Sequence, residues 1–272
     1  MTERVTRVER FASDRRRSLG RFAWNRRSRH GGERANPAIR WRVVLLGVIF
    51  GFVAAEVLYF TFRPNGLWGF GLFMDGHTVL DAARDWTAGR GFYEAYQLAG
   101  PHPIGIREIL YPPPLLALLV PFAFAPILVW VVVPLAIVVY IVWWWRPGFW
   151  GLVAIGLCLW VPETFGAYLF ANPSIWFAAF VAVATRWPAF GPLVLLKPTL
   201  APFALVGIRH RAWWVTAALV AGSALISLPM WSDWLTVMRN VNASPANWTY
   251  SLPVVPLLLI PVIAKWQSAG RP

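Results

Sequence analysis

Two ionisable residues occur in or beside apolar sequence, where a charge is costly unless it has a partner or a function. Asp75 follows the glycine- and aromatic-rich stretch 66–74, and Lys197 lies in the middle of the apolar segment 189–208. An aspartate at a membrane boundary can take a proton from a sugar hydroxyl, and a lysine at membrane depth can meet the phosphate of a lipid carrier. The structural alternatives are an N-terminal cap for a helix that begins near His77 and a lysine that extends to the interface from a re-entrant hairpin.

Other polar residues have simpler explanations in the sequence. Asn172 opens an apolar segment, where capping of the helix start is the default role. Asp81 and Asp85 are one helical turn apart with Arg84 alongside, so we expect a solvated face that pairs with arginine or water. Cys158 is the only cysteine, which excludes an intramolecular disulfide and a thiol metal cluster. We therefore name no metal ligand and expect no resident cofactor, while a requirement for a divalent metal ion stays open.

The elements that must position these residues are apolar. Hydrophobic residues make up 58% of the 272 residues and charged residues only 14%, which is far from the composition of a soluble domain. The net charge of +13 comes mostly from arginines that precede the first long apolar run, a pattern that holds this end of a membrane protein in the cytoplasm. The chain is thus predicted to be an all-α, multi-pass protein of the inner or plasma membrane that contacts membrane lipids and no nucleic acid.

The sequence divides into a basic tail and a membrane domain. Residues 1–42 are predicted to be a disordered cytoplasmic tail, and 43–272 a multi-spanning domain of about seven or eight membrane-embedded segments. The first span is 43–62, and the region 63–110 is a large external loop with an amphipathic helix over 77–88. The later segments are 113–125, 127–145, 149–160, 173–185, 189–208, 213–230 and 252–265.

The number of crossings stays open at this stage. If every segment crosses the membrane, Arg146 and Arg186 lie outside, which the positive-inside rule disfavours. Merging or folding back two segments moves both arginines inside. Several segments are short and contain prolines, so tilted, broken or re-entrant segments are alternatives to simple spans.

Three stretches together resemble a known family. They are Asp75 through Tyr93 (DGHTVLDAARDWTAGRGFY), Tyr111 through Pro121 (YPPPLLALLVP), and Asn172 through Arg211, which contains LLKPT and a basic turn. Their order and spacing are similar to those of glycosyltransferase family 87 of the GT-C superfamily, which contains polyprenyl-phosphate-mannose-dependent mannosyltransferases. The chain departs from the family pattern at Leu169-Phe170-Ala171, where the family often has Gly-Gln before the asparagine, and it is shorter than most members.

The resemblance implies an inverting transfer of a hexose such as mannose from a polyprenyl-phosphate donor to a lipid or glycan acceptor on the extracytoplasmic face. It implies that Asp75 is the general base and that Lys197 lies near the donor phosphate. His77, Arg84 and Tyr111 are weaker candidates for the same pocket, and Asn172 is a further substrate-binding candidate.

Two other classes of function compete with this hypothesis. Broken helices and charges at membrane depth also occur in transporters and flippases, although the two halves of the sequence show no internal repeat. A non-catalytic scaffold that keeps the family core is the other alternative. A dispensable Asp75 would favour either of these over an enzyme.

Overall fold

The computed structural model describes residues 47, 51, 71–103, 108–242 and 254–268. The chain divides into two compact units, Met1–Val48 and Ile49–Pro272, and all the helices discussed below belong to the second unit. The predicted tail, nearly all of the first predicted span and part of the predicted external loop lie outside the described residues. The described residues are helical, apart from one isolated β-bridge, and confirm the all-α class for this part of the chain.

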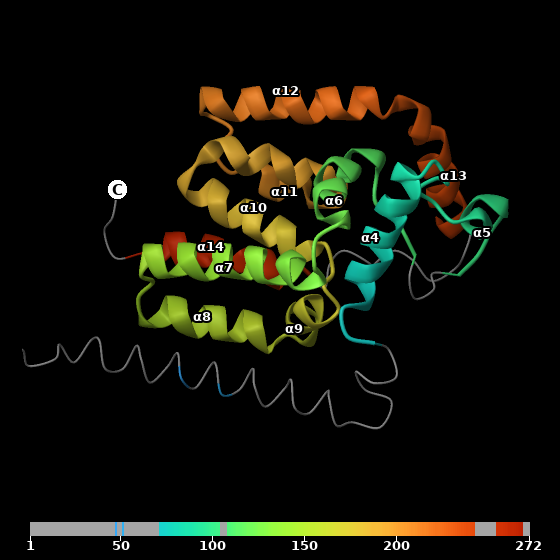
Figure 1. The fold of residues 1–272 in the computed structure, drawn as a ribbon. Helices are drawn as coiled ribbons and strands as arrows, with labels where there is room; N and C mark the ends of the chain where they lie inside the picture. The colour runs from blue at the N-terminus through green and yellow to red at the C-terminus, as the bar shows by residue number, and fades with distance from the viewer. Residues whose placement is uncertain (1–46, 48–50, 52–70, 104–107, 243–253, 269–272) are drawn as a thin grey trace, which may run out of the picture. The chain divides into compact units, whose positions relative to one another are not determined.

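The helices follow one another along the chain, with 3₁₀-helices marked η (Figure 1). They are α4 (Met74–Thr87), α5 (Ala95–Ala99), η1 (Pro113–Leu115), α6 (Leu116–Ala123), α7 (Ile127–Trp145), α8 (Phe149–Trp160), α9 (Pro162–Leu169), α10 (Ser174–Arg186), η2 (Pro188–Leu196), η3 (Pro198–Leu200), α11 (Ala201–Ala204), α12 (Arg211–Ile226), η4 (Leu228–Met230), α13 (Trp231–Asn242) and α14 (Val255–Trp266).

The helices long and apolar enough to cross a membrane are fewer than the seven or eight predicted segments. Among the described residues α7 qualifies alone, with 19 residues. Two bent pairs qualify if each is counted as one span: α8 with α9, which meet at 67°, and α12 with the stretch Leu228–Val241, which meet at 62°. One to three candidate spans make a membrane location compatible with the fold. The apolar helices near α6, α10 and α14 are shorter than a typical crossing.

Several predicted boundaries agree with the structure. The helices α7 and α8 begin and end at the predicted residues, and α10 is displaced by one residue from the predicted segment 173–185. The agreement has a local cause, because each helix is a continuous apolar run that ends at a proline, glycine or arginine. Pro134 lies inside α7 without ending it.

The predicted segment 189–208 is not one helix. It consists of η2, η3 and α11, because Pro188, Pro192, Pro198 and Pro202 each lack an N–H group and interrupt the α-helical hydrogen-bond ladder. The stretch runs back along α10, so that Lys197 at its far end contacts Ser174. The chain then returns to the start of η2. Gly207 lies so close to Pro188 that an added Cβ would overlap the proline ring. The segment therefore folds back on itself.

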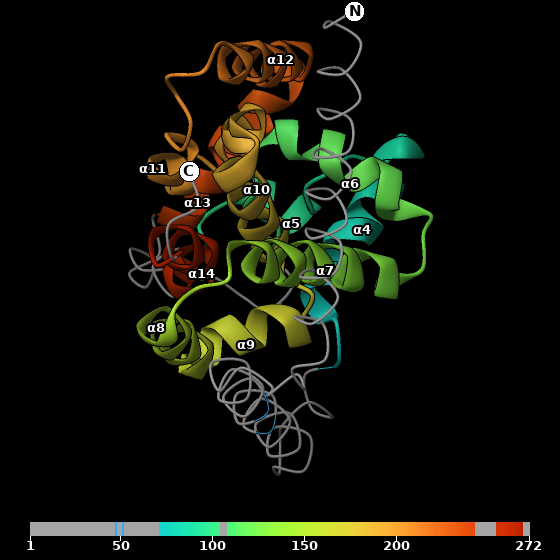
Figure 2. The same ribbon diagram turned by 90° about the vertical axis from the view of Figure 1, so that its left-hand side faces the viewer.

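The helices α7, α10 and α14 pack side by side and run in the same direction. At their starting ends, the indole N–H of Trp130 in α7 donates to the carbonyl of Ala171, just before α10 (2.9 Å). At their finishing ends, Trp145 donates to the hydroxyl of Thr185 (2.8 Å), and the loop after α7 bonds to the end of α14. Most of α10 is buried between its neighbours, so this helix is central to the core (Figures 1 and 2).

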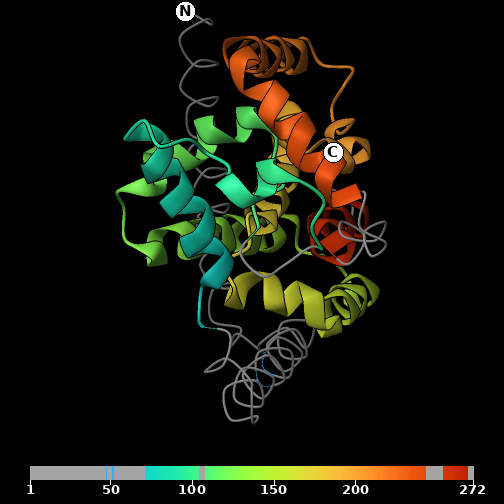
Figure 3. The ribbon, with the colours of Figure 1, turned by 90° about the vertical axis from the view of Figure 1, so that its right-hand side faces the viewer.

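The start of α10 adjoins the elements of the predicted external loop. The helix α4 packs its apolar face, with Val79, Leu80 and Ala83, towards the core beside α6. Its amphipathic character was predicted, but it begins three residues earlier than expected, at Met74. The short helix α5 lies beside α13 (Figure 3), where the Asn240 amide donates to the carbonyl of Gln97 (2.8 Å).

Candidate functional site

Four of the six predicted site residues lie together at the start of α10. Asn172 is at the centre of the cluster, because its amide N–H donates to the Asp75 carboxylate over 2.7 Å. The amide oxygen of Asn172 accepts the Tyr111 hydroxyl (3.4 Å) and the backbone N–H of Ser174 (2.9 Å). These contacts join α4, the segment before η1 and the turn before α10.

Lys197 completes the cluster from the far end of η2. Its side chain is buried, with 7% of its surface exposed, and its ammonium donates to the Ser174 hydroxyl (3.4 Å). The same ammonium lies 5.3 Å from the centroid of the Tyr111 ring, within the range of a cation–π contact. Lys197 and Asp75 interact electrostatically. The cluster thus combines a carboxylate and an ammonium linked by polar side chains.

The environment of Asp75 changes its acidity in two opposing ways. Burial raises its pKa above the ordinary aspartate value, because the charged form loses hydration. The hydrogen bond from Asn172 and the positive charge of Lys197 both lower the pKa, but burial is the largest effect. A partly desolvated carboxylate with a raised pKa is a stronger base than an exposed one, so Asp75 is suited to accept a proton.

The backbone around Asp75 is held in place by the turn before α10. The N–H of Phe73 donates to the carbonyl of Leu169 (2.8 Å), and that of Gly76 donates to the carbonyl of Phe170 (3.0 Å). Phe73 and Ala171 both have left-handed backbone angles, with φ of 62° and 55°, which are unfavourable for residues other than glycine. Two strained positions thus flank the contact between the two segments.

Gly76 allows this close approach of the two segments. A Cβ added at Gly76 would lie 2.6 Å from the Cβ of Ala171 and 2.9 Å from Cδ1 of Ile127, closer than atoms normally pack. No larger side chain fits without movement of the backbone. The position of Asp75 relative to Asn172 therefore depends on a glycine next to the aspartate.

The capping alternative for Asp75 is wrong. The helix α4 begins at Met74 with Phe73 in the capping position, and Asp75 belongs to the first helical turn. The capping position of α10 is Pro173, but the side chain of Asn172, one residue earlier, accepts the N–H of the first residue of the helix. It uses its other amide group to hold Asp75, which its position in the sequence did not indicate.

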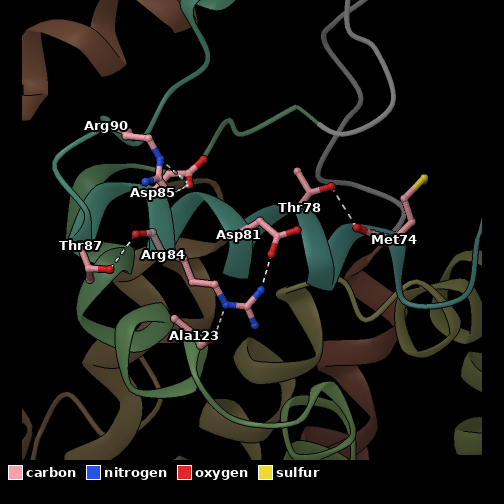
Figure 4. Close-up of polar contacts among 8 residues, drawn as sticks. All are labelled: Met74, Thr78, Asp81, Arg84, Asp85, Thr87, Arg90 and Ala123. Atoms are coloured by element: carbon pink, nitrogen blue, oxygen red, sulfur yellow. Dashed lines mark hydrogen bonds and ion pairs between the residues drawn. The ribbon is translucent and has the colours of Figure 1, made fainter.

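Two predicted site residues lie apart from the cluster. His77 is two positions beyond Asp75 on α4 and is exposed. Arg84 lies near the other end of α4, where it pairs with Asp81 and donates to the carbonyl of Ala123 (Figure 4). Asp85 pairs with Arg90 on the same exposed surface, so the predicted polar face with ion pairs is present.

Two contacts in and beside the cluster were not predicted from the sequence. Ser174 was noted only as part of the motif that Asn172 begins, yet its hydroxyl connects Lys197 to the rest of the cluster. Tyr93 is buried, and its hydroxyl donates to the backbone carbonyl of Tyr111 (2.8 Å). A serine two residues from a predicted site residue was the available signal for the first contact. The place of Tyr93 at the end of the stretch Asp75 through Tyr93 was the signal for the second.

The described residues contain no group of three or more His, Cys, Asp or Glu side chains that could hold a metal ion. The site chemistry available to this part of the chain is that of one carboxylate, one ammonium, and the amide and hydroxyl groups between them.

Comparison with known proteins gives no match: no family model, no curated protein and no solved structure is similar to this chain. The resemblance to glycosyltransferase family 87 rests on the three sequence stretches alone.

Proposed function

We propose that this chain is a membrane glycosyltransferase that moves a hexose such as mannose from a polyprenyl-phosphate donor to a hydroxyl of a lipid or glycan acceptor. The observation that supports the proposal best is the Asp75–Asn172 hydrogen bond (2.7 Å), with buried Lys197 close by. Asp75 and Lys197 are separated by more than a hundred residues in the sequence, yet they form one electrostatically coupled site.

In the proposed reaction the Asp75 carboxylate removes the proton of the acceptor hydroxyl as its oxygen attacks the anomeric carbon of the sugar. The bond between this carbon and the phosphate oxygen breaks, and its electron pair stays on the departing polyprenyl phosphate. The fixed positive charge of Lys197 favours that developing charge. Attack from the side opposite the leaving group inverts the configuration of the sugar.

The proposal includes a finer topology. About seven or eight membrane-embedded segments, some of them broken or folded back, place the cluster at the extracytoplasmic face, and the N-terminus is cytoplasmic. The folded-back stretch of η2 and η3 supports this arrangement, because it reduces the number of crossings.

A transporter or flippase for an anionic substrate is the second candidate. It is favoured by the same interrupted segment, since discontinuous helices also form transporter binding sites and this one carries the buried Lys197. The two functions differ in what they require of Asp75. A transferase needs a base, whereas a transporter of an anionic substrate does not.

The test replaces Asp75 with Asn and measures sugar transfer from labelled polyprenyl-phosphate hexose in membranes that contain equal amounts of protein. Asp81→Asn is the matched control, because Asp81 is an exposed aspartate of the same helix that pairs with Arg84. Loss of transfer in Asp75→Asn alone supports the proposal. Transfer that survives Asp75→Asn refutes the role of Asp75 as the base, and absence of transfer in the unmodified chain with every donor favours the transporter.

A further inference from the structure

Basic residues gather at the end of the helix bundle opposite the Asp75 cluster. Arg146 follows α7, Arg186 is the last residue of α10, and Lys265 lies in the last turn of α14. The three helix ends are close together, because the Lys265 ammonium lies 5.7 Å from the ring centroid of Trp145, and Trp145 bonds to Thr185. Three cations therefore share one end of the bundle.

The folded-back segment adds two further arginines to this end. Gly207 is packed against Pro188, two residues beyond Arg186. Arg209 and Arg211 follow Gly207 directly, and both are exposed. The loop that joins α11 to α12 thus brings its basic turn to the same end as α7 and α10.

No acidic residue balances these cations within the adjoining described sequence. The stretches 127–160, 174–232 and 254–268 contain no Asp or Glu. By contrast, Arg84 and Arg90 on α4 are paired with aspartates. Within these described stretches, the ends of α7, α10 and α14 therefore carry positive charge with no carboxylate on the same elements.

Arg186 has an environment suited to an anionic oxygen. Its guanidinium carbon lies 3.5 Å from the centroid of the Trp144 ring and 4.4 Å from that of Trp187. Its Nη1 atom is buried and has no hydrogen-bond partner among the described residues. A buried N–H group without a partner is unfavourable, and a phosphate oxygen would satisfy it with a charge-assisted hydrogen bond.

The surroundings of these cations are aromatic and aliphatic. Trp143, Trp150 and Trp266 are exposed at the same end, and tryptophan is typical of the membrane–water interface. The outward face of α7 continues from this end with exposed Val132 and Val139. A phospholipid fits both features, because its headgroup can meet the arginines while its acyl chains lie along the apolar helix.

We propose that Arg146, Arg186, Arg209, Arg211 and Lys265, with the neighbouring tryptophans, form a basic–tryptophan face that binds the phosphate groups of anionic phospholipids, with Arg186 as the principal contact. The face directs this end of the bundle towards an anionic leaflet and the Asp75 cluster towards the opposite side. This inference holds whether the chain is a transferase or a transporter, because it uses none of the residues of the Asp75 cluster.

The test uses the purified full chain in micelles that contain phosphatidylglycerol and phosphatidylcholine in equal amounts. Native mass spectrometry measures the ratio of the two lipids retained by the protein. Each basic residue near an anionic surface favours binding by about fivefold. We expect a clear preference for phosphatidylglycerol in the unmodified chain and a preference lower by about fivefold in Arg186→Gln.

Arg90→Gln is the matched control, because it removes one positive charge at an exposed ion pair on α4 and leaves the basic–tryptophan face intact. The double variant Arg209→Gln/Arg211→Gln changes only exposed side chains of the face. If Arg186→Gln does not fold, a lower preference for phosphatidylglycerol in this double variant tests the proposal instead. No lipid preference in the unmodified chain overturns the proposal, as does an equal loss in Arg90→Gln. Displacement of the lipid by millimolar inorganic phosphate also overturns it, because that result identifies a site for the free ion.

Discussion

Replacement of Asn172 by Ala tests how the site controls the acidity of Asp75. The Asn172 amide donates to the Asp75 carboxylate over 2.7 Å, and this bond favours the charged carboxylate. Hydrogen bonds to charged groups contribute about 1.5–3 kcal/mol. Loss of the bond removes a contribution of this size to the charged form and therefore raises the pKa of Asp75 further.

The sign of the effect on activity follows from the role of the base. Burial has already raised the pKa of Asp75 above its ordinary value, and a general base works only when it is ionised. Activity is therefore lost as the pH falls through the pKa of Asp75. In Asn172→Ala this loss begins at a higher pH than in the unmodified chain.

The measurement is the dependence of kcat/KM on pH for hexose transfer, which reports the ionisation of groups in the free enzyme. Tyr111→Phe is the control, because the Tyr111 hydroxyl donates to Asn172 and not to Asp75. It should leave the acidic limb of the profile in place. An acidic limb in Asn172→Ala that coincides with that of the unmodified chain, or that moves to lower pH, refutes the reasoning.

A second readout of the same prediction does not depend on activity. A raised pKa means that the folded chain holds the Asp75 proton more tightly than the unfolded chain. The stability of the unmodified chain relative to Asp75→Asn should therefore fall as the pH rises from about 3.9 through the raised pKa, and stay constant above it. When Asn172→Ala is added to the unmodified chain and to Asp75→Asn, the fall in their relative stability should extend to higher pH. Thermal midpoints in detergent measure this stability.

Two further predictions concern the packing that supports the site and the bundle. Gly76→Ala should lower the thermal midpoint, because overpacking against Ala171 costs about 1–3 kcal/mol. In Gly222→Ala, where the added Cβ meets no atom within 4 Å, the midpoint should rise; equal effects of the two changes would contradict this explanation. Thr185→Val should destabilise the chain in a denaturation assay by about 1–3 kcal/mol, because it leaves the buried N–H of Trp145 without its acceptor. Thr185→Ser should retain most of the stability, and an equal loss in both variants would exclude the hydrogen bond as the cause.

The sequence was sufficient to predict the features that depend on local pattern. The helical class follows from long apolar runs, and the bounds of α7 and α8 follow from the proline, glycine and arginine residues at their ends. The polar face of Asp81 and Asp85, with Arg84 as a partner, was predicted from helical spacing. Arg90, which pairs with Asp85, lies beyond the end of the helix. Each of these features is decided by neighbours within a few turns of the chain.

Other features depend on packing between distant segments, and local pattern could not determine them. Asp75 and Asn172 are 97 residues apart in the sequence, and their hydrogen bond exists because Gly76 permits α4 to approach the turn before α10. The fold-back that brings Lys197 to Ser174 depends on how a proline-interrupted segment packs against α10. Apolar periodicity shows that such segments are buried, but the tertiary structure alone decides which polar side chains meet where they pack.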